Sequence, residues 1–149
     1  MRINTRNFGE IEILQEDIIS FEDGIIGFDS FSRFSIIQIE LEDGTYPLYC
    51  LQDIDNTDIS FIMMDIVSSV LEYRPTINDD LIEDLGDAND ESLLVYNIAT
   101  IGKDLKDTTV NLKAPIVINT ESKKGKQVIC MQEYPIKYKI FEDISLVTI

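Results

Sequence analysis

Two apolar runs near the middle decide the fold of this 149-residue chain: Phe34-Ser35-Ile36-Ile37-Gln38-Ile39 and Tyr46-Pro47-Leu48-Tyr49-Cys50-Leu51-Gln52, with Asp43-Gly44 between them. Both runs are rich in β-branched or aromatic residues, which predicts strands. An Asp-Gly pair between two strands is typical of a tight hairpin turn. Pro47 stands near the start of the second strand, where its missing N–H interrupts the ladder least. The centre of the chain is therefore predicted to be an antiparallel hairpin.

Strand signals continue on both sides of this hairpin. Acidic residues and isoleucines alternate over residues 10–13, as in a half-buried strand, and a turn at Gly9 makes residues 2–14 a predicted hairpin. Pro115 and Lys124-Gly125 predict breaks between strands near the C-terminal end. The remaining apolar runs of strand length are residues 59–64, 93–98, 108–112, 116–119 and 127–132.

One helix is predicted after residue 78. Asn78 or Asp79 supplies an N-cap oxygen, an apolar stripe follows at residues 81, 82 and 85, and Gly86 supplies the C-cap. Residues 66–73 predict a second short helical turn. About eight or nine short strands with one or two short helices favour a mainly β fold, a small antiparallel β-barrel-like domain. No linker or repeat divides residues 1–149, so a single domain is expected.

The charge of the chain is large and unevenly distributed. The formal net charge is -16, and residues 34–102 alone carry -14, whereas residues 103–139 carry +4. Such a surface repels nucleic acid and anionic lipid, because phosphate binding needs clustered Lys and Arg. Cations or basic proteins are the expected partners, with no direct nucleic acid and no membrane. The alternative is that the charge serves solubility alone. The acidic surface is expected to be one-sided if the fold keeps these two segments apart.

Two acidic clusters are the candidate partner-binding sites. They surround the predicted hairpin with the turn after it, and the predicted helix. Like charges packed this closely repel one another, and a partner rich in Lys or Arg relieves that repulsion. Solvated surface is the alternative for both clusters. The candidate residues are Glu40, Glu42, Asp43, Asp53, Asp55 and Asp58 in the first cluster, and Asp79, Asp80, Glu83, Asp84 and Asp87 in the second, which Asp90 and Glu91 extend.

The residues that usually carry catalysis are missing. The chain has no histidine, which removes the commonest general base and metal ligand, and it has no glycine-rich phosphate loop. Residues 53–58 begin like a calcium-binding loop, but Asp58 stands where the loop needs Gly. We therefore expect a non-enzymatic protein without cofactor or metal. A carboxylate enzyme stays an alternative, because paired acids suffice for some hydrolases.

Other features indicate location and local structure. No signal peptide and no apolar run long enough to span a membrane is present, and Cys50 and Cys130 lie in apolar runs as buried thiols, so a cytoplasmic protein is expected. Residues 24–27 have a GxxG spacing among acids, which indicates a structural turn. Four phenylalanines, Phe21, Phe28, Phe31 and Phe34, are expected in the core, and three amides, Asn111, Asn119 and Gln127, are expected to satisfy backbone groups at strand ends.

Several motifs, taken in order along the chain, resemble the flagellar assembly factor FliW family. They are Phe21-Glu22-Asp23-Gly24-Ile25-Ile26-Gly27-Phe28, Pro47-Leu48-Tyr49-Cys50-Leu51-Gln52-Asp53, Ile59-Ser60-Phe61-Ile62, residues 108–119, and Gly125-Lys126-Gln127-Val128-Ile129. The resemblance covers essentially the whole chain. One departure is Asp65-Ile66, where the family pattern has an acid or Asn followed by Pro.

The resemblance implies a compact β-barrel-like fold without enzymatic activity. It also implies two partners: flagellin, and CsrA, a small RNA-binding repressor of flagellin translation that the family protein sequesters until flagellin displaces it. An export chaperone for a secreted helical protein, with no role in translation, is the alternative. That function would need an exposed apolar groove, for which Phe28, Met63 and Met64 are the candidate lining residues.

Overall fold

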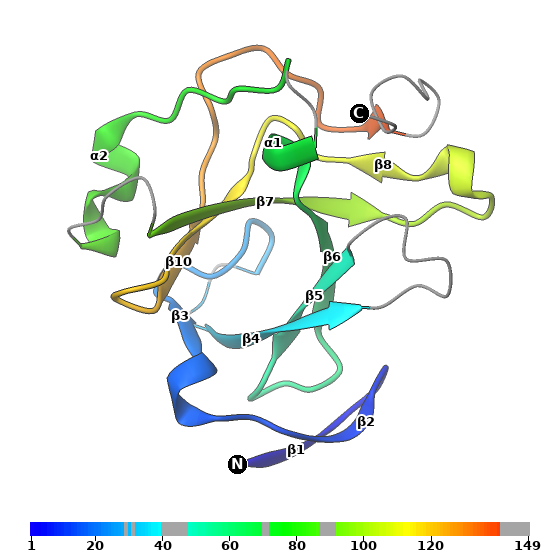
Figure 1. Ribbon diagram of the computed structural model, residues 1–149, viewed down its shortest axis with the longest axis vertical. Helices are drawn as coiled ribbons and strands as arrows, with labels where there is room; N and C mark the ends of the chain where they lie inside the picture. Colours follow the sequence, from blue (N-terminus) through cyan, green and yellow to red (C-terminus); the bar gives the residue numbers. More distant parts are fainter. Residues whose placement is uncertain (29, 31, 40–47, 70–71, 87–91, 141–149) are drawn as a thin grey trace.

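The structure is a computed structural model, and it describes residues 1–28, 30, 32–39, 48–69, 72–86 and 92–140. Strands dominate it, and they form a barrel with a separate hairpin below it and a short helix beside it (Figure 1). The elements are β1 Arg2–Thr5, β2 Gly9–Glu12, η1 Gln15–Asp17, β3 Ile19–Phe21, β4 Ser32–Ile39, β5 Leu48–Asp53, β6 Ser60–Met64, α1 Ile66–Ser69, α2 Asp79–Ile82, η2 Glu83–Leu85, β7 Leu93–Thr100, η3 Leu105–Asp107, β8 Thr109–Val110, β9 Ile116–Asn119, β10 Lys124–Gln127 and β11 Tyr138–Lys139.

Seven strands close into the barrel, in the order β3-β4-β5-β6-β7-β9-β10, with β10 returning to β3. The two remaining strands of this sheet, β8 and β11, extend it from the end of β7 and lie outside the ring. Six of the seven contacts in the ring are antiparallel, but β10 and β3 are parallel, with Lys124 opposite Ser20. The expected mainly β barrel is therefore confirmed, although it is mixed rather than purely antiparallel.

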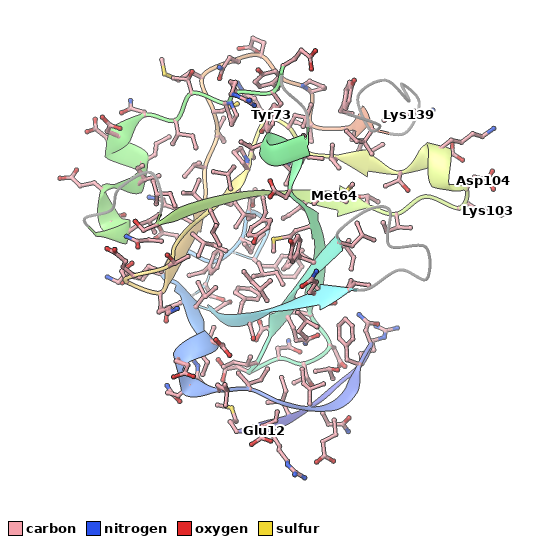
Figure 2. The ribbon with its side chains drawn as sticks, viewed as in Figure 1. Glu12, Met64, Tyr73, Lys103, Asp104 and Lys139 are labelled. Atoms are coloured by element: carbon pink, nitrogen blue, oxygen red, sulfur yellow. The ribbon has the colours of Figure 1, made fainter. Side chains whose placement is uncertain are left out.

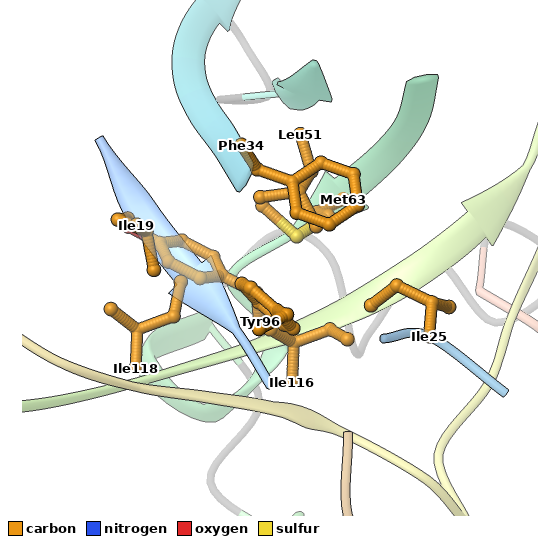
Figure 3. Packing of buried hydrophobic residues seen from close by; sticks show 9 residues of the cluster. Ile19, Ile25, Phe34, Leu51, Met63, Tyr96, Ile116 and Ile118 are labelled. Carbon is orange, nitrogen blue, oxygen red and sulfur yellow. The ribbon is translucent and has the colours of Figure 1, made fainter. Parts of the chain in front are cut away.

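The barrel interior is filled by apolar side chains from nearly every strand of the ring (Figure 3). Alternate residues of a strand face the same side, so each ring strand except β10 contributes one or two of them. The ring of Phe21 meets that of Phe34 edge-to-face, with centroids 5.1 Å apart. The core residues are Ile19, Phe21, Ile25, Phe34, Leu51, Met63, Tyr96, Ile116 and Ile118. Of the four phenylalanines expected in the core, Phe21 and Phe34 are buried, whereas Phe31 lies outside the described residues.

The expected break at Lys124-Gly125 is wrong, because both residues lie inside β10. The turn comes earlier, where Lys123 adopts a φ of 59° and the side chain of Asn119 accepts hydrogen bonds from the amides of Glu121 and Ser122. Gly125 serves close packing instead, since a Cβ there would collide with the ring of Phe21. The segment 128–130 runs extended along 113–115, but Pro115 has no N–H with which to complete a ladder.

The N-terminal hairpin β1–β2 and helix α2 match their predictions. Asn78 caps α2 by accepting the N–H of Asp80 at 3.0 Å, and Gly86 ends η2 with a φ of 88°. The last turn is a 3-10 turn, so the helix is shorter than predicted. The expected turn at Asp43-Gly44 lies outside the described residues. The strand β3 was not predicted, because an alternation of apolar and polar residues cannot be recognised over only three positions.

Candidate functional site

Three amides at strand ends hold the loops around the barrel, as expected. The Oδ1 of Asn111 accepts from the amides of Lys113 and Ala114, at 3.1 and 3.0 Å. The side chain of Asn119 joins the turn before β10 to the end of η2, because its Nδ2 donates to the carbonyl of Leu85 at 3.0 Å. Since Asn119 is fully buried, its amide is a structural group rather than a contact for a partner.

The loop after β3 turns back over one end of the barrel and inserts Ile25 into the core. Gly24 and Gly27 have φ values of 69° and 93°, which only glycine adopts readily, so the GxxG stretch is the structural turn that was expected. Gln127 of β10 fixes the loop by accepting the amide of Ile26 at 2.9 Å. This turn leaves the side chain of Phe28 48% exposed, so the expectation that Phe28 lies in the core is wrong.

The turn between β5 and β6, which belongs to the first acidic cluster, is held by side-chain hydrogen bonds. The buried side chain of Gln52 donates from Nε2 to the carbonyls of Asp53, Thr57 and Ile59, at 2.9, 3.1 and 3.3 Å. The carboxylate of Asp53 accepts the amides of the two residues Asp55 and Asn56, at 2.9 and 2.8 Å, as an Asx turn does. Asp53 is therefore a buried structural residue, which its acidic sequence context did not indicate.

Asp55 and Asp58 are the exposed acids of this turn. Asp55 forms a two-point ion pair with Arg33 of β4, through contacts of 2.6 and 3.0 Å. The hydrogen bond from Arg33 is the main cause that holds the pKa of Asp55 below its ordinary value. Asp58 makes no ion pair with any described residue. Of the three candidate acids in the turn, Asp58 therefore offers its charge most directly to a partner.

A pocket of about 250 Å³ opens between this turn and the loop that carries Phe28. Aromatic rings form its apolar side: Phe28 meets Phe61 edge-to-face at 5.6 Å, and Phe34 lies behind Phe61 at 6.2 Å. Asp53 and Asp55 line its polar side. An apolar pocket with a few polar groups at its edge is typical of a binding site for a partner side chain.

The second acidic cluster lies elsewhere. Asp79, Asp80, Glu83 and Asp84 are exposed on α2 and η2, which Figure 1 places at the upper left, whereas the β5–β6 turn lies below the barrel. Lys126 of β10 pairs with Asp84 at 3.3 Å and with Asp23 at 3.6 Å. Acidic and basic segments thus meet at this edge, so the fold does not keep them apart, which was the condition for a one-sided acidic surface. The other candidates, Glu40, Glu42, Asp43 and Asp87, lie outside the described residues.

Two expectations about the apolar and sulfur-containing residues have different outcomes. Met63 and Met64 are buried, so they line no exposed groove, although Phe28 does line a pocket. Cys50 and Cys130 are both buried thiols, and burial raises the pKa of Cys50. Within the described ranges, no three side chains of His, Cys, Asp or Glu gather as a metal site would require. No helix in the same part of the chain has the length and apolar character to cross a membrane.

Comparisons with known proteins agree on one family. The family model described as "FliW protein" matches residues 2–140. The flagellar assembly factor FliW of Thermoanaerobacter pseudethanolicus is 43% identical over 146 residues, which are 97% of this chain and 96% of the relative. The protein of the same name from Alkaliphilus metalliredigens is 39% identical, over 97% and 89% of the two chains.

A solved structure extends this agreement to the fold. The crystal structure of the flagellar assembly factor FliW superimposes with a TM-score of 0.80 and 31% identity, and the match covers 93% of this chain and 96% of the other. The family consists of assembly factors rather than enzymes. The chain therefore belongs to the FliW family of flagellar assembly factors.

Proposed function

We propose that this protein binds flagellin and sequesters a CsrA-type RNA-binding regulator, and that flagellin displaces the regulator. Sequestration relieves repression of flagellin translation. Flagellin is therefore translated when this protein is free of flagellin and holds the regulator. Membership in a family of flagellar assembly factors supports a flagellar partner. A regulator that binds RNA carries basic surface, which an acidic chain of net charge -16 suits.

The β5–β6 turn carries this proposal, because it combines three features in one place. Its exposed acids, Asp55 and Asp58, supply charge, and the pocket beside them supplies an apolar anchor between Phe28 and Phe61. Gln52 and Asp53 hold the turn in one shape before a partner arrives. A preformed site loses little conformational entropy on binding, so more of the contact energy appears as affinity. The basic regulator is the partner that this combination suits.

Charge reversal at the turn tests the proposal. In Asp58→Lys, association with the purified regulator should slow and its salt dependence should flatten, because steering by charge acts mainly on the association rate. Asp104→Lys is the matched control, since it makes the same charge change on an exposed residue that belongs to neither acidic cluster. Equal association rates for both variants and the unchanged protein would show that the acids of the turn are solvated surface only.

Loss of RNA from the regulator is the second step of the proposed function. A complex of this protein with the regulator should bind flagellin messenger RNA more weakly than the regulator does alone, whether the RNA is blocked directly or repelled by charge. The measurement is a titration of labelled RNA against the regulator, with and without a saturating amount of this protein. An RNA affinity that does not change would contradict both mechanisms.

An export chaperone without a role in translation is the alternative function. The observation in its favour is the exposed ring of Phe28 beside an aromatic pocket. This pocket suits an apolar side chain of a secreted protein as well as it suits a side chain of the basic regulator. The two functions differ in one result. A chaperone would bind flagellin, but flagellin and the regulator would not exclude each other.

A further inference from the structure

The pocket beside Phe28 brings aromatic rings and carboxylates together. Phe28 and Phe61 line its apolar side, and Asp53 and Asp55 line its polar side. Its volume of about 250 Å³ is smaller than the roughly 300–1,000 Å³ of most sites that enclose a small molecule. The pocket therefore suits one side chain of a larger partner, and its lining residues determine which side chain that is.

The β5–β6 turn uses only one of the two carboxylate oxygens of Asp53. Oδ1 accepts the amides of Asp55 and Asn56, whereas no described residue forms a hydrogen bond or an ion pair with Oδ2. Asp53 is 6% exposed and lines the pocket, so a donor for Oδ2 has to come through the pocket, from water or from a ligand. A cationic donor binds a carboxylate oxygen more strongly than water does.

The charges of the described residues at the pocket suit one cation. Asp53 and Asp55 carry two negative charges, and Arg33, which binds Asp55 through contacts of 2.6 and 3.0 Å, carries one positive charge. The three residues together are therefore negative by one charge. The ion pair uses two of the roughly four acceptor positions of the Asp55 carboxylate, so this carboxylate can accept further donors.

The aromatic rings favour arginine over lysine as this cation. A guanidinium group stacks on aromatic rings and also donates from a rigid fork to carboxylates, whereas a lysine ammonium is a compact point charge. We propose that the pocket binds one arginine side chain of the basic regulator, with its guanidinium group between Oδ2 of Asp53 and the rings of Phe28 and Phe61. This inference deepens the proposed function and rests on it only for the identity of the partner.

The N-terminal hairpin supports the polar side of the pocket. The amide of Arg6 donates to the carbonyl of Thr57 in the β5–β6 turn at 3.4 Å, and Nδ2 of Asn7 donates to the hydroxyl of Ser60 at 3.0 Å. Figure 2 shows Glu12 of the same hairpin at the lower end of the molecule. The turn is thus attached to the barrel and to the hairpin, so the pocket needs little ordering when a side chain enters it.

Two short peptides test the chemistry without the regulator. A glycine-arginine-glycine peptide with blocked ends is titrated into the isotope-labelled protein and followed by nuclear magnetic resonance. The control peptide carries citrulline, which has nearly the shape of arginine but no charge. The arginine peptide should bind about tenfold more tightly, because charge-assisted hydrogen bonds contribute more than neutral ones, and it should shift the ring resonances of Phe28 and Phe61. Equal affinities, or no ring shift with either peptide, would overturn the proposal.

A matched pair of variants locates the bound arginine. Asp53→Asn keeps an oxygen that can accept the two amides of the turn, but it removes the charge, so the preference for the arginine peptide over the citrulline peptide should disappear. Asp58→Asn makes the same charge change in the same turn, at a residue outside the pocket wall, and should keep the preference. Equal effects of the two substitutions would mean that the general charge of the turn attracts arginine, and they would overturn the proposal.

Binding of the regulator separates this inference from the proposed function. Phe28→Ala should weaken binding of the regulator several-fold, whereas Ile26→Ala, which shortens another exposed side chain of the same loop outside the pocket wall, should not. A regulator that binds the natural protein and both variants equally would overturn the inference and leave the proposed function intact. A regulator that does not bind the natural protein would contradict the proposed function, and the peptide titration would then decide whether the pocket binds arginine.

Discussion

The ring of Phe21 packs directly against the backbone of Gly125 and leaves no room for a β-carbon between them. This contact joins β3 to β10, the one parallel pair in the ring of seven strands. The amide of Ser20 donates to the carbonyl of Lys123 at 2.9 Å beside it. Because β3 is only three residues long, the closure of the barrel depends on few backbone bonds and on this close approach.

Gly125→Ala should therefore destabilise the protein. The added methyl group must displace the buried ring of Phe21, and overpacking of a core costs about 1–3 kcal/mol. The free energy of unfolding is measured by urea denaturation. Phe21→Leu provides the control, because in its presence Gly125→Ala should cost less than in the natural chain. Equal costs in both backgrounds would show that the two residues do not interact.

Asn119→Ala should also lower the free energy of unfolding. The substitution removes the hydrogen bonds that the side chain makes to the amides of Glu121 and Ser122 and to the carbonyl of Leu85, although that carbonyl keeps the hydroxyl of Ser122 as a donor. A hydrogen bond contributes about 0.5–1.5 kcal/mol net. Asn7→Ala is the control, since among the described residues that exposed amide bonds only to the hydroxyl of Ser60. A change of the same size in both variants would contradict the structural role of Asn119.

Gln52→Leu should loosen the β5–β6 turn. Its Nε2 holds three carbonyls of this turn, and the substitution removes all three bonds while it keeps a buried side chain of similar size. The amides of residues 54–59 should exchange with deuterium faster than before, whereas those of β9 should not. Binding of the regulator should weaken together with this loosening. Faster exchange without a change in binding would separate the turn from the proposed function.

High pH should weaken the fold through two buried tyrosines. Burial raises the pKa of Tyr73 and of Tyr96 to about 12. In the unfolded chain a tyrosine ionises near pH 10, so above that pH the unfolded state loses protons that the folded state keeps. The free energy of unfolding should therefore be unaffected by these groups below about pH 10 and should fall between about pH 10 and pH 12.

Removal of the Tyr73 hydroxyl separates the contribution of Tyr73 to this loss of stability from that of Tyr96. Tyr73→Phe should show a smaller loss of stability over the same pH range, although it is less stable at neutral pH because Asn97 and Leu112 lose a hydrogen-bond partner. The comparison is between the pH slopes of the free energy of unfolding of the two proteins, because contributions that both proteins share cancel. Identical slopes would mean that Tyr73 does not titrate with a raised pKa.

The sequence predicts most strands of the barrel because their apolar runs have the right length and period. Residues 116–119 form β9 with the predicted bounds, and Asn78 caps α2 as its side-chain chemistry requires. The turn at Gly24 follows from the same logic, since a positive φ there excludes other residues. These features depend on neighbours in the sequence, and local rules suffice for them.

The features that the sequence did not predict depend on distant residues. Gly125 resembles a turn signal until Phe21, about a hundred positions earlier, is known to pack on it. Asp53 resembles a surface acid, but its carboxylate holds a turn, and Phe28 resembles core although the loop turns it outward. The separation of the two acidic clusters likewise follows from the closure of the barrel and not from their spacing along the chain.

Competition between the two proposed partners is the most direct test of partner switching. The regulator, labelled with a fluorophore, is bound to this protein, and unlabelled flagellin is then added in increasing amounts while fluorescence anisotropy is recorded. We predict that anisotropy falls to the value of the free regulator as flagellin saturates the protein. An anisotropy that stays constant or rises, which indicates a complex of all three proteins, would contradict the proposed function.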